Sequence, residues 1–153
     1  MRLALFTLLF LVATGCDSSS DELRLDNDYY VGSWELVSVS DGNGDQTALI
    51  NTLVDDLTAD FEQDGGFRLD ADLNSLLNTL GQEDIVIEGT YTAQPDVPAL
   101  VLQADGFAPS FQVSADTRET VALTAPAAVV GQLLGPLDAI NLAGDVTLTV
   151  RRI

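Results

Sequence analysis

Carboxylates make up most of the reactive side chains in this chain. Its 153 residues include 24 Asp and Glu, six Arg, one Cys, and neither His nor Lys. Most general bases, activated nucleophiles and imidazole or thiolate metal sites are therefore missing. A carboxylate pair of the glycosidase type would need one carboxyl in a shielded pocket. Seven acids instead alternate with apolar residues, which predicts that they face water and that the protein is not an enzyme: Asp60, Glu62, Asp70, Asp72, Glu88, Asp105 and Asp116.

One loop has oxygen ligands at the spacing that a hard cation requires. In the segment Asp41-Gly42-Asn43-Gly44-Asp45, the residues Asp41, Asn43 and Asp45 occupy alternate positions, as at the start of a calcium loop. The pattern then departs from such a loop, because Gln46 replaces its glycine and Thr52 replaces its final glutamate. A solvated turn between a strand and a helix is the more ordinary interpretation. We therefore expect no metal and no other cofactor.

The single cysteine follows a short apolar segment at the N-terminus. Arg2 precedes an apolar run, Leu3 to Ala13, which has the length of a signal-peptide core and is too short for a permanent membrane span. Ala13-Thr14-Gly15-Cys16 resembles the lipobox of bacterial lipoprotein precursors, although the first position is usually leucine. The resemblance implies that residues 1–15 are removed and that Cys16 carries a diacylglycerol and fatty chains such as palmitate. An ordinary secretory signal followed by a chance cysteine is the alternative.

A lipid on Cys16 would hold the protein on a membrane, since two fatty chains make such an attachment persistent. Residues 16–28 are polar and acidic, which predicts a flexible tether between the lipid and one domain at residues 29–153. An acidic stretch after the cysteine resembles the signal of surface lipoproteins, whereas in other lineages an aspartate such as Asp17 retains the protein at the inner membrane. We expect a cell-envelope protein at the outer membrane or cell surface. Its oligomeric state is left open.

The net charge of −18 restricts the partners of the protein. Such a surface repels nucleic acid and anionic lipid headgroups, so neither is expected to bind. The acids are mostly aspartate, which resembles the surfaces of proteins from salt-loving organisms. Self-repulsion would destabilise the domain at low salt, and about 1 M salt would screen most of it. A secreted protein that is acidic without being halophilic is the alternative.

Short segments that alternate apolar and polar residues fill the body of the chain, as is typical of half-buried strands. The pattern predicts eight strands, and the clearest hairpin turns at Asp64-Gly65-Gly66. Two short helices are also predicted, from Gln46 to Asp56 and from Ala127 to Leu134, the second ending at Gly135-Pro136. The eight strand segments are 33–40, 57–62, 67–73, 85–92, 100–104, 111–116, 120–125 and 146–151.

Eight antiparallel strands with one apolar face favour an all-β fold, a closed up-and-down barrel, although a two-sheet sandwich has the same alternation. Val31-Gly32-Ser33-Trp34 resembles the Gly-x-Trp opening of lipocalin and lipocalin-like domains. The resemblance implies that Trp34 closes one end of the barrel against an arginine of the last strand, and strand parity selects Arg152. The absence of a disulfide and a helix placed before the final strand depart from a typical lipocalin.

The lipocalin-like resemblance also implies a binding interior. A barrel of eight strands can be filled by side chains or can hold one small apolar ligand. We expect non-catalytic binding of a small apolar or amphiphilic molecule. The alternative is a filled barrel or sandwich that acts as a protein–protein interaction module in the envelope. The candidate lining residues are Trp34, Leu36, Phe61, Phe67, Tyr91, Leu102, Phe111 and Leu148.

Overall fold

The computed structural model describes residues 25–94, 96–115, 117–134 and 141–153. The expected signal peptide, Cys16, most of the expected tether and Asp116 lie outside these ranges. Within them, no helix has both the length and the apolar character needed to span a membrane.

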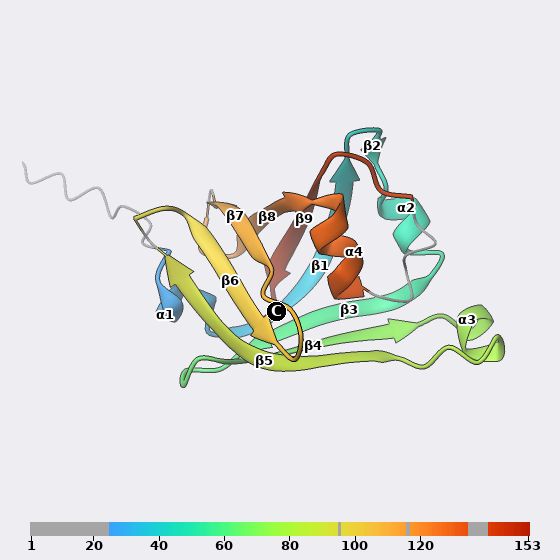
Figure 1. Cartoon of the computed structure of the whole chain (residues 1–153), viewed down its shortest axis with the longest axis horizontal. Helices are drawn as coiled ribbons and strands as arrows, with labels where there is room; N and C mark the ends of the chain where they lie inside the picture. The colour runs from blue at the N-terminus through green and yellow to red at the C-terminus, as the bar shows by residue number, and fades with distance from the viewer. Residues whose placement is uncertain (1–24, 95, 116, 135–140) are drawn as a thin grey trace, which may run out of the picture.

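In the described part of the chain, nine strands form one antiparallel sheet, and eight of them close into a barrel (Figure 1). The ninth strand, β2 (Gly44–Asp45), pairs only with the end of β1 and lies outside the barrel. Each barrel strand pairs with the next along the chain, which is the up-and-down arrangement. The barrel strands are β1 (Gly32–Asp41), β3 (Val54–Phe61), β4 (Gly66–Leu73), β5 (Ile85–Gln94), β6 (Ala99–Ala104), β7 (Ser110–Ala115), β8 (Thr120–Pro126) and β9 (Asp145–Arg152).

The first strand closes the barrel because it has two barrel neighbours. The first half of β1 pairs with β3, from Gly32 opposite Phe61 to Glu35 opposite Thr58. β1 also pairs with β9 from Trp34 to Ser40, and the register shifts once, between Leu36 and Ser38. A sandwich would leave β1 and β9 on separate edges. The predicted closed barrel of eight strands is therefore confirmed.

The alternation along the strands directs apolar side chains into a single core. On β4, Phe67 and Leu69 are buried, whereas Arg68 between them is exposed. On β8, Val121 and Leu123 are buried in the same way. Each such side chain contributes roughly 1.5 to 3 kcal/mol when it is fully buried. All buried apolar residues in the described part of the chain belong to one cluster, and no charged residue there is buried.

The described residues contain four short helices rather than the two predicted from sequence: α1 (Asn27–Tyr30), α2 (Thr47–Ile50), α3 (Ser75–Thr79) and α4 (Ala127–Leu134). The prediction of α4 is confirmed. Chain order places α1 at one end of the barrel, here called the α1 end. The other three helices lie at the opposite end, the α4 end (Figure 1). Ile50 of α2 and Val130 and Leu133 of α4 are buried, so these two helices cover the core there.

The prediction of a helix from Gln46 to Asp56 is wrong. Only α2 is helical, and β3 already begins at Val54. The apolar residues of this segment fit helical spacing, but Val54 is buried in extended pairing with Leu73. A β-branched residue packs well on such a pleated surface, and tertiary pairing overrides weak helical periodicity. The helices α1 and α3 were not expected because four or five residues are too few to show a period.

Candidate ligand-binding interior

Trp34 and Arg152 close the α1 end of the barrel together. They lie opposite each other in the pairing of β1 with β9, and the guanidinium carbon of Arg152 lies 4.5 Å from the centroid of the Trp34 ring. The guanidinium also donates hydrogen bonds to the carbonyl oxygens of Tyr29 and Val31. The Trp34 indole N–H donates to the carbonyl oxygen of Tyr30 at 2.7 Å. The structure thus brings the expected pair together, and both residues hold α1 across the end of the barrel.

The local backbone conformation explains the glycine of the Gly-x-Trp segment. Gly32 has a φ of +121°, a conformation that L side chains rarely adopt. A Cβ at this position would also lie 3.0 Å from a guanidinium nitrogen of Arg152. The chain can therefore turn from α1 into β1 and leave room for the arginine.

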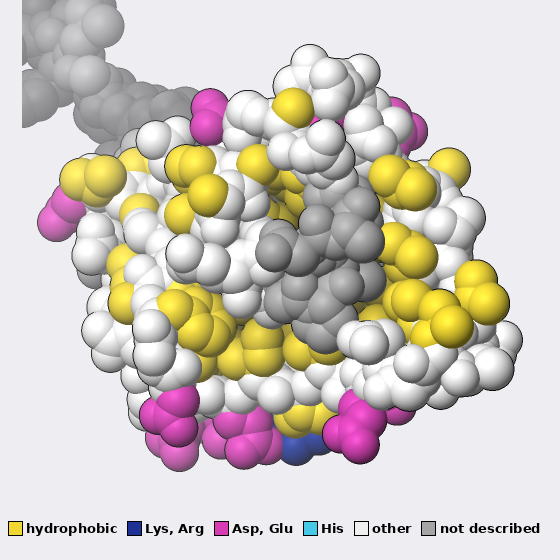
Figure 2. All heavy atoms as spheres, turned by 45° about the vertical axis from the view of Figure 1, so that its right-hand side comes forward, with side chains coloured by type: hydrophobic (Ala, Val, Ile, Leu, Met, Phe, Trp, Pro, Cys, Tyr) yellow, Lys and Arg dark blue, Asp and Glu magenta, His cyan; other side chains and the backbone are white. Residues whose placement is uncertain are grey.

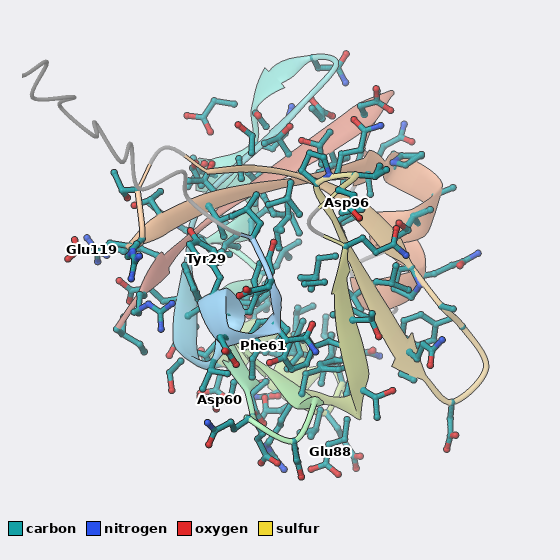
Figure 3. All side chains as sticks on the ribbon, turned by 90° about the vertical axis from the view of Figure 1, so that its left-hand side faces the viewer. Tyr29, Asp60, Phe61, Glu88, Asp96 and Glu119 are labelled. Atoms are coloured by element: carbon teal, nitrogen blue, oxygen red, sulfur yellow. The ribbon has the colours of Figure 1, made fainter. Side chains whose placement is uncertain are left out.

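Aromatic rings cover the α1 end from inside the barrel. Figure 3 looks onto this end, with α1 in front and Tyr29 and Phe61 labelled. The Tyr30 ring lies 6.0 Å from Phe61 and 6.5 Å from Tyr91, and Phe61 lies 4.9 Å from Tyr91, measured between ring centroids. Such edge and tilted arrangements add roughly 0.5 to 1.5 kcal/mol per pair to the burial of the rings. We call this group the aromatic floor: Tyr29, Tyr30, Trp34, Phe61, Phe67 and Tyr91.

The three tyrosine hydroxyls of the aromatic floor differ in their partners. Tyr29 donates to the carbonyl oxygen of Thr117 at 2.8 Å, and the Tyr91 hydroxyl lies 3.1 Å from the carbonyl oxygen of Glu62. The hydroxyl of Tyr30 is buried and has no hydrogen-bond partner among the described residues. Burial raises the pKa of Tyr30 well above its ordinary value, and the neighbouring Tyr29 adds to this shift. Tyr30 therefore stays a neutral phenol that can donate one hydrogen bond.

An unpartnered buried hydroxyl is unusual in a folded protein. Most buried polar atoms are paired, and leaving one unpaired costs about 1 to 3 kcal/mol. The Tyr30 side chain is only 1% exposed, so this atom has no access to bulk solvent. An acceptor atom placed beside it would recover that free energy.

Seven of the eight lining residues expected from sequence are buried in the core: Trp34, Phe61, Phe67, Tyr91, Leu102, Phe111 and Leu148. The eighth, Leu36, is only partly buried, because it follows the last residue of β1 that pairs with β3. There it borders a small cavity of about 50 Å³, together with Ile50 and Val54. The structure therefore places the candidate residues in one interior that reaches from the aromatic floor towards the α4 end.

Sequence reasoning did not single out Tyr29 or Tyr30 as site residues. They precede the first alternating segment, so no strand pattern marked them as inward-facing. The available signal was local: two consecutive aromatic residues directly follow an acidic, polar stretch. Large aromatic side chains are uncommon in flexible tethers, because such tethers do not bury apolar surface.

The weak metal candidate is a hydrogen-bonded turn. One Asp41 carboxylate oxygen accepts from the backbone N–H of Asn43 at 2.8 Å and from the Gln46 amide at 3.0 Å, and the other accepts from the N–H of Ala143 at 2.9 Å. Asp45 accepts from the N–H of Thr47. The bond from Ala143 lowers the pKa of Asp41 most. The bond from Ala143 ties the turn to the segment before β9, and no cluster of ligands for a metal is found among the described residues.

The six strand acids within the described ranges do not form a catalytic pair in a shielded pocket. Glu62, Asp72, Glu88 and Asp105 are exposed, whereas Asp60 and Asp70 are partly buried. Asp70 and Glu88 both pair with the exposed Arg68 on the outer face of the sheet, at 2.7 Å and 2.6 Å. Among the described residues, the polar group that stands out is therefore the Tyr30 hydroxyl, which is buried in the apolar interior without a hydrogen-bond partner. Compared with known proteins, the chain matches no family model and no curated protein.

Proposed function

We propose that this chain is a cell-envelope lipoprotein, anchored through Cys16, whose barrel binds a small apolar or amphiphilic molecule without catalysis. The observation that carries the proposal is the Tyr30 hydroxyl, a buried donor without a partner inside a closed, apolar barrel. A ligand atom that accepts this hydrogen bond would satisfy the hydroxyl. The apolar body of the ligand would leave water and pack against the apolar side chains of the core, which is favourable.

The charge distribution favours a neutral amphiphile over a fatty acid. No described charged residue is buried, and the guanidinium of Arg152 is already bound to the carbonyl oxygens of Tyr29 and Val31. Burying a carboxylate in an apolar site costs several kcal/mol of free energy. One hydrogen bond from a phenol does not offset that cost. We therefore expect a carbonyl or hydroxyl group at the polar end of the ligand.

The surface around the α4 end supports the approach of an apolar molecule. Leu49 of α2 is 44% exposed, Leu76 of α3 is 62% exposed, and Leu80 directly after α3 is 69% exposed. Figure 2 shows hydrophobic side chains gathered over this side of the molecule. An exposed apolar surface of this kind lowers the free-energy cost of removing water from the protein and the ligand as an apolar ligand approaches.

Removing one oxygen atom tests the role of Tyr30. A fluorescent fatty alcohol and a hydrocarbon dye without polar atoms are titrated into the purified protein at about 1 M salt, where self-repulsion is screened. Tyr30→Phe is expected to weaken binding of the alcohol about 3- to 10-fold, the value of one hydrogen bond. Binding of the hydrocarbon dye is expected to stay unchanged.

Tyr29→Phe is the matched control, since it also removes one hydroxyl from the aromatic floor. It breaks the bond to Thr117, so it is expected to lower stability without changing the affinity for either probe. Equal binding of the alcohol by wild type and Tyr30→Phe would show that the Tyr30 hydroxyl does not contact the ligand. If neither probe binds to wild type, the barrel is filled and the interaction module becomes the better proposal.

The anchor is tested separately. Wild-type protein is expected to partition with membranes and into a detergent phase, and Cys16→Ser is expected to appear in the aqueous phase. A Cys16→Ser protein that stays with the membrane would rule out the lipid anchor. That result would leave the binding experiments unaffected.

A further inference from the structure

The barrel has an unpaired strand edge at the start of β5. This strand pairs with β4 from Ile85 to Thr90, but its pairing with β6 begins only at Gly89, opposite Ala104. The β6–β7 hairpin ends beside the middle of β5 (Figure 1), so the segment Ile85–Glu88 has a strand on one side only within the described part of the chain.

The register identifies which backbone groups are free at this edge. Tyr91 donates its N–H to Gly65 on the β4 side, and hydrogen-bonded pairs of an antiparallel ladder recur at every second residue. Ile85, Ile87 and Gly89 therefore direct their N–H and C=O groups towards β4. Val86 and Glu88 direct theirs away from β4: Val86 lies beyond the end of β6, and Glu88 lies opposite Asp105, the first residue after β6.

The side chains show the effect of the missing neighbour. Leu69 and Ala71 on β4 are 6% and 0% exposed, whereas Ile85 and Ile87, which face the same core across the ladder, are only partly buried. Val86 on the outer face is 50% exposed. Soluble proteins usually protect such edges with lysine, proline, a bulge or a covering segment.

A groove lies beside this edge. It has a volume of about 440 Å³ and is lined by Val86, Ile87, Glu88, Ala104, Asp105 and Phe107. Its inner wall is apolar, and its outer wall carries the carboxylates of Glu88 and Asp105. Glu83 and Asp84 come directly before β5; the Asp84 carboxylate accepts a hydrogen bond from the N–H of Leu73 on the β4 side, so only Glu83 extends the acidic rim.

We propose that this edge, the β5 edge formed by Ile85–Glu88, binds an extended cationic segment of a partner protein as an additional antiparallel strand. Main-chain hydrogen bonds to Val86 and Glu88 would supply affinity, as in other cases of strand addition. Residues opposite each other in a sheet share a face. The segment would therefore alternate apolar residues, facing Ile87 and Phe107, with arginine or lysine on the outer face, where Asp105 adds a carboxylate beside Glu88, which already pairs with Arg68.

Charge makes a second copy of this chain the poorer occupant. Two copies would bring their own β5 edges, with Glu83 and Glu88, against one another, and each chain carries a net charge of −18. Like charges placed opposite each other on adjacent strands are destabilising. A cationic segment meets the same carboxylates with a favourable interaction. This inference is independent of the proposed ligand in the barrel.

The probe is a short synthetic peptide that alternates valine and arginine, with a fluorescent label, in about 0.15 M salt. Its anisotropy is expected to rise saturably, and the amides of Val86 and Glu88 are expected to exchange more slowly with solvent. The same peptide with N-methyl groups on alternate amides keeps its charge and side chains. It loses the backbone N–H groups that would donate hydrogen bonds to the β5 edge. It is expected to bind about 10-fold more weakly or not at all.

Val86→Pro removes an N–H that points away from β4, a position that tolerates proline in an edge strand. With an unchanged thermal melt, this variant is expected to lose peptide binding. Asp105→Lys is expected to weaken binding several-fold. Glu119→Lys, the same charge change in the β7–β8 loop and far from Glu88 in Figure 3, is expected to have little effect.

Four results would overturn the proposal. Equal binding of the N-methylated peptide would show attraction by charge alone. Binding that persists in Val86→Pro, or weakens equally in Asp105→Lys and Glu119→Lys, would place the peptide elsewhere. A dimer of the wild-type protein that dissociates in Val86→Pro would identify a second copy as the occupant. The N-methylated peptide needs only wild-type protein, so the test holds even if a variant does not fold.

Discussion

A Cβ atom at Gly89 would lie 2.0 Å from the carbonyl oxygen of Gln103 and 2.8 Å from a ring carbon of Phe67. Real Cβ atoms essentially never approach other atoms so closely. Gly89 is also the residue of β5 at which pairing with β6 begins. The close approach of these two strands therefore depends on the absence of a side chain at this position.

Gly89→Ala is expected to destabilise the barrel by about 2 to 3 kcal/mol, the cost of overpacking against atoms that cannot move freely. Urea unfolding followed by Trp34 fluorescence measures the change. Gly66→Ala is the control, because a Cβ there meets only the flexible carboxylates of Glu62 and Asp64. The control is expected to cost less than about 1 kcal/mol. Equal stability of the two variants would contradict the close approach.

Arg152→Met keeps the aliphatic stem of the arginine but removes the guanidinium. The variant loses the contact with the Trp34 ring and the bonds to Tyr29 and Val31, so it is expected to lose about 2 to 4 kcal/mol of unfolding free energy. Arg152→Lys is expected to recover little of this unfolding free energy, because an ammonium lacks the planar guanidinium that bonds both carbonyl oxygens.

Arg151→Met is the matched control for Arg152, since the two residues are neighbours on opposite faces of β9. The Arg151 side chain is 59% exposed and pairs with Glu35, so its loss is expected to cost at most about 1 kcal/mol. Equal losses at the two positions would mean that Arg152 does not hold the α1 end.

Asp41 is expected to contribute to the loss of stability in acid. Hydrogen bonds, first that from Ala143, lower the pKa of Asp41 below its ordinary value of 3.8. The stabilisation is therefore present above that pH and is lost as the pH falls through the lower folded-state pKa. Asp41→Asn is expected to lower the melting temperature at neutral pH and to lose less on acidification than wild type. Asp105→Asn removes the same charge and is expected to follow the wild-type curve.

Salt is expected to stabilise the protein. All charged residues in the described ranges lie at least partly in solvent, and the chain carries a net charge of −18. Raising the salt from dilute buffer to about 1 M shortens the screening length to about 3 Å. The melting temperature is expected to rise by about 5 °C or more, and equimolar sucrose serves as an uncharged comparison. A flat response to salt would refute the halophilic interpretation.

Alternation and parity predicted most of the barrel. Eight segments with period two predict its strands, and the lipocalin-like resemblance together with the parity of the last strand predicts the contact of Arg152 with Trp34. The failures have a common cause. Val54 follows apolar residues at helical spacing, and only its pairing with Leu73 makes it a strand residue. Tyr30 lies outside any periodic segment, and its unpaired hydroxyl is a property of packing between elements distant in sequence.

The ring closure of the barrel also affects how the chain folds. Most strand pairs join neighbours along the chain, but β1 meets β9, where Glu35 and Arg151 are separated by 116 positions. Bringing such distant residues together costs entropy before it yields contacts, which slows folding. Until β9 has been synthesised, β1 and β8 are both open borders of an apolar sheet. The nascent protein is then at its most vulnerable to aggregation.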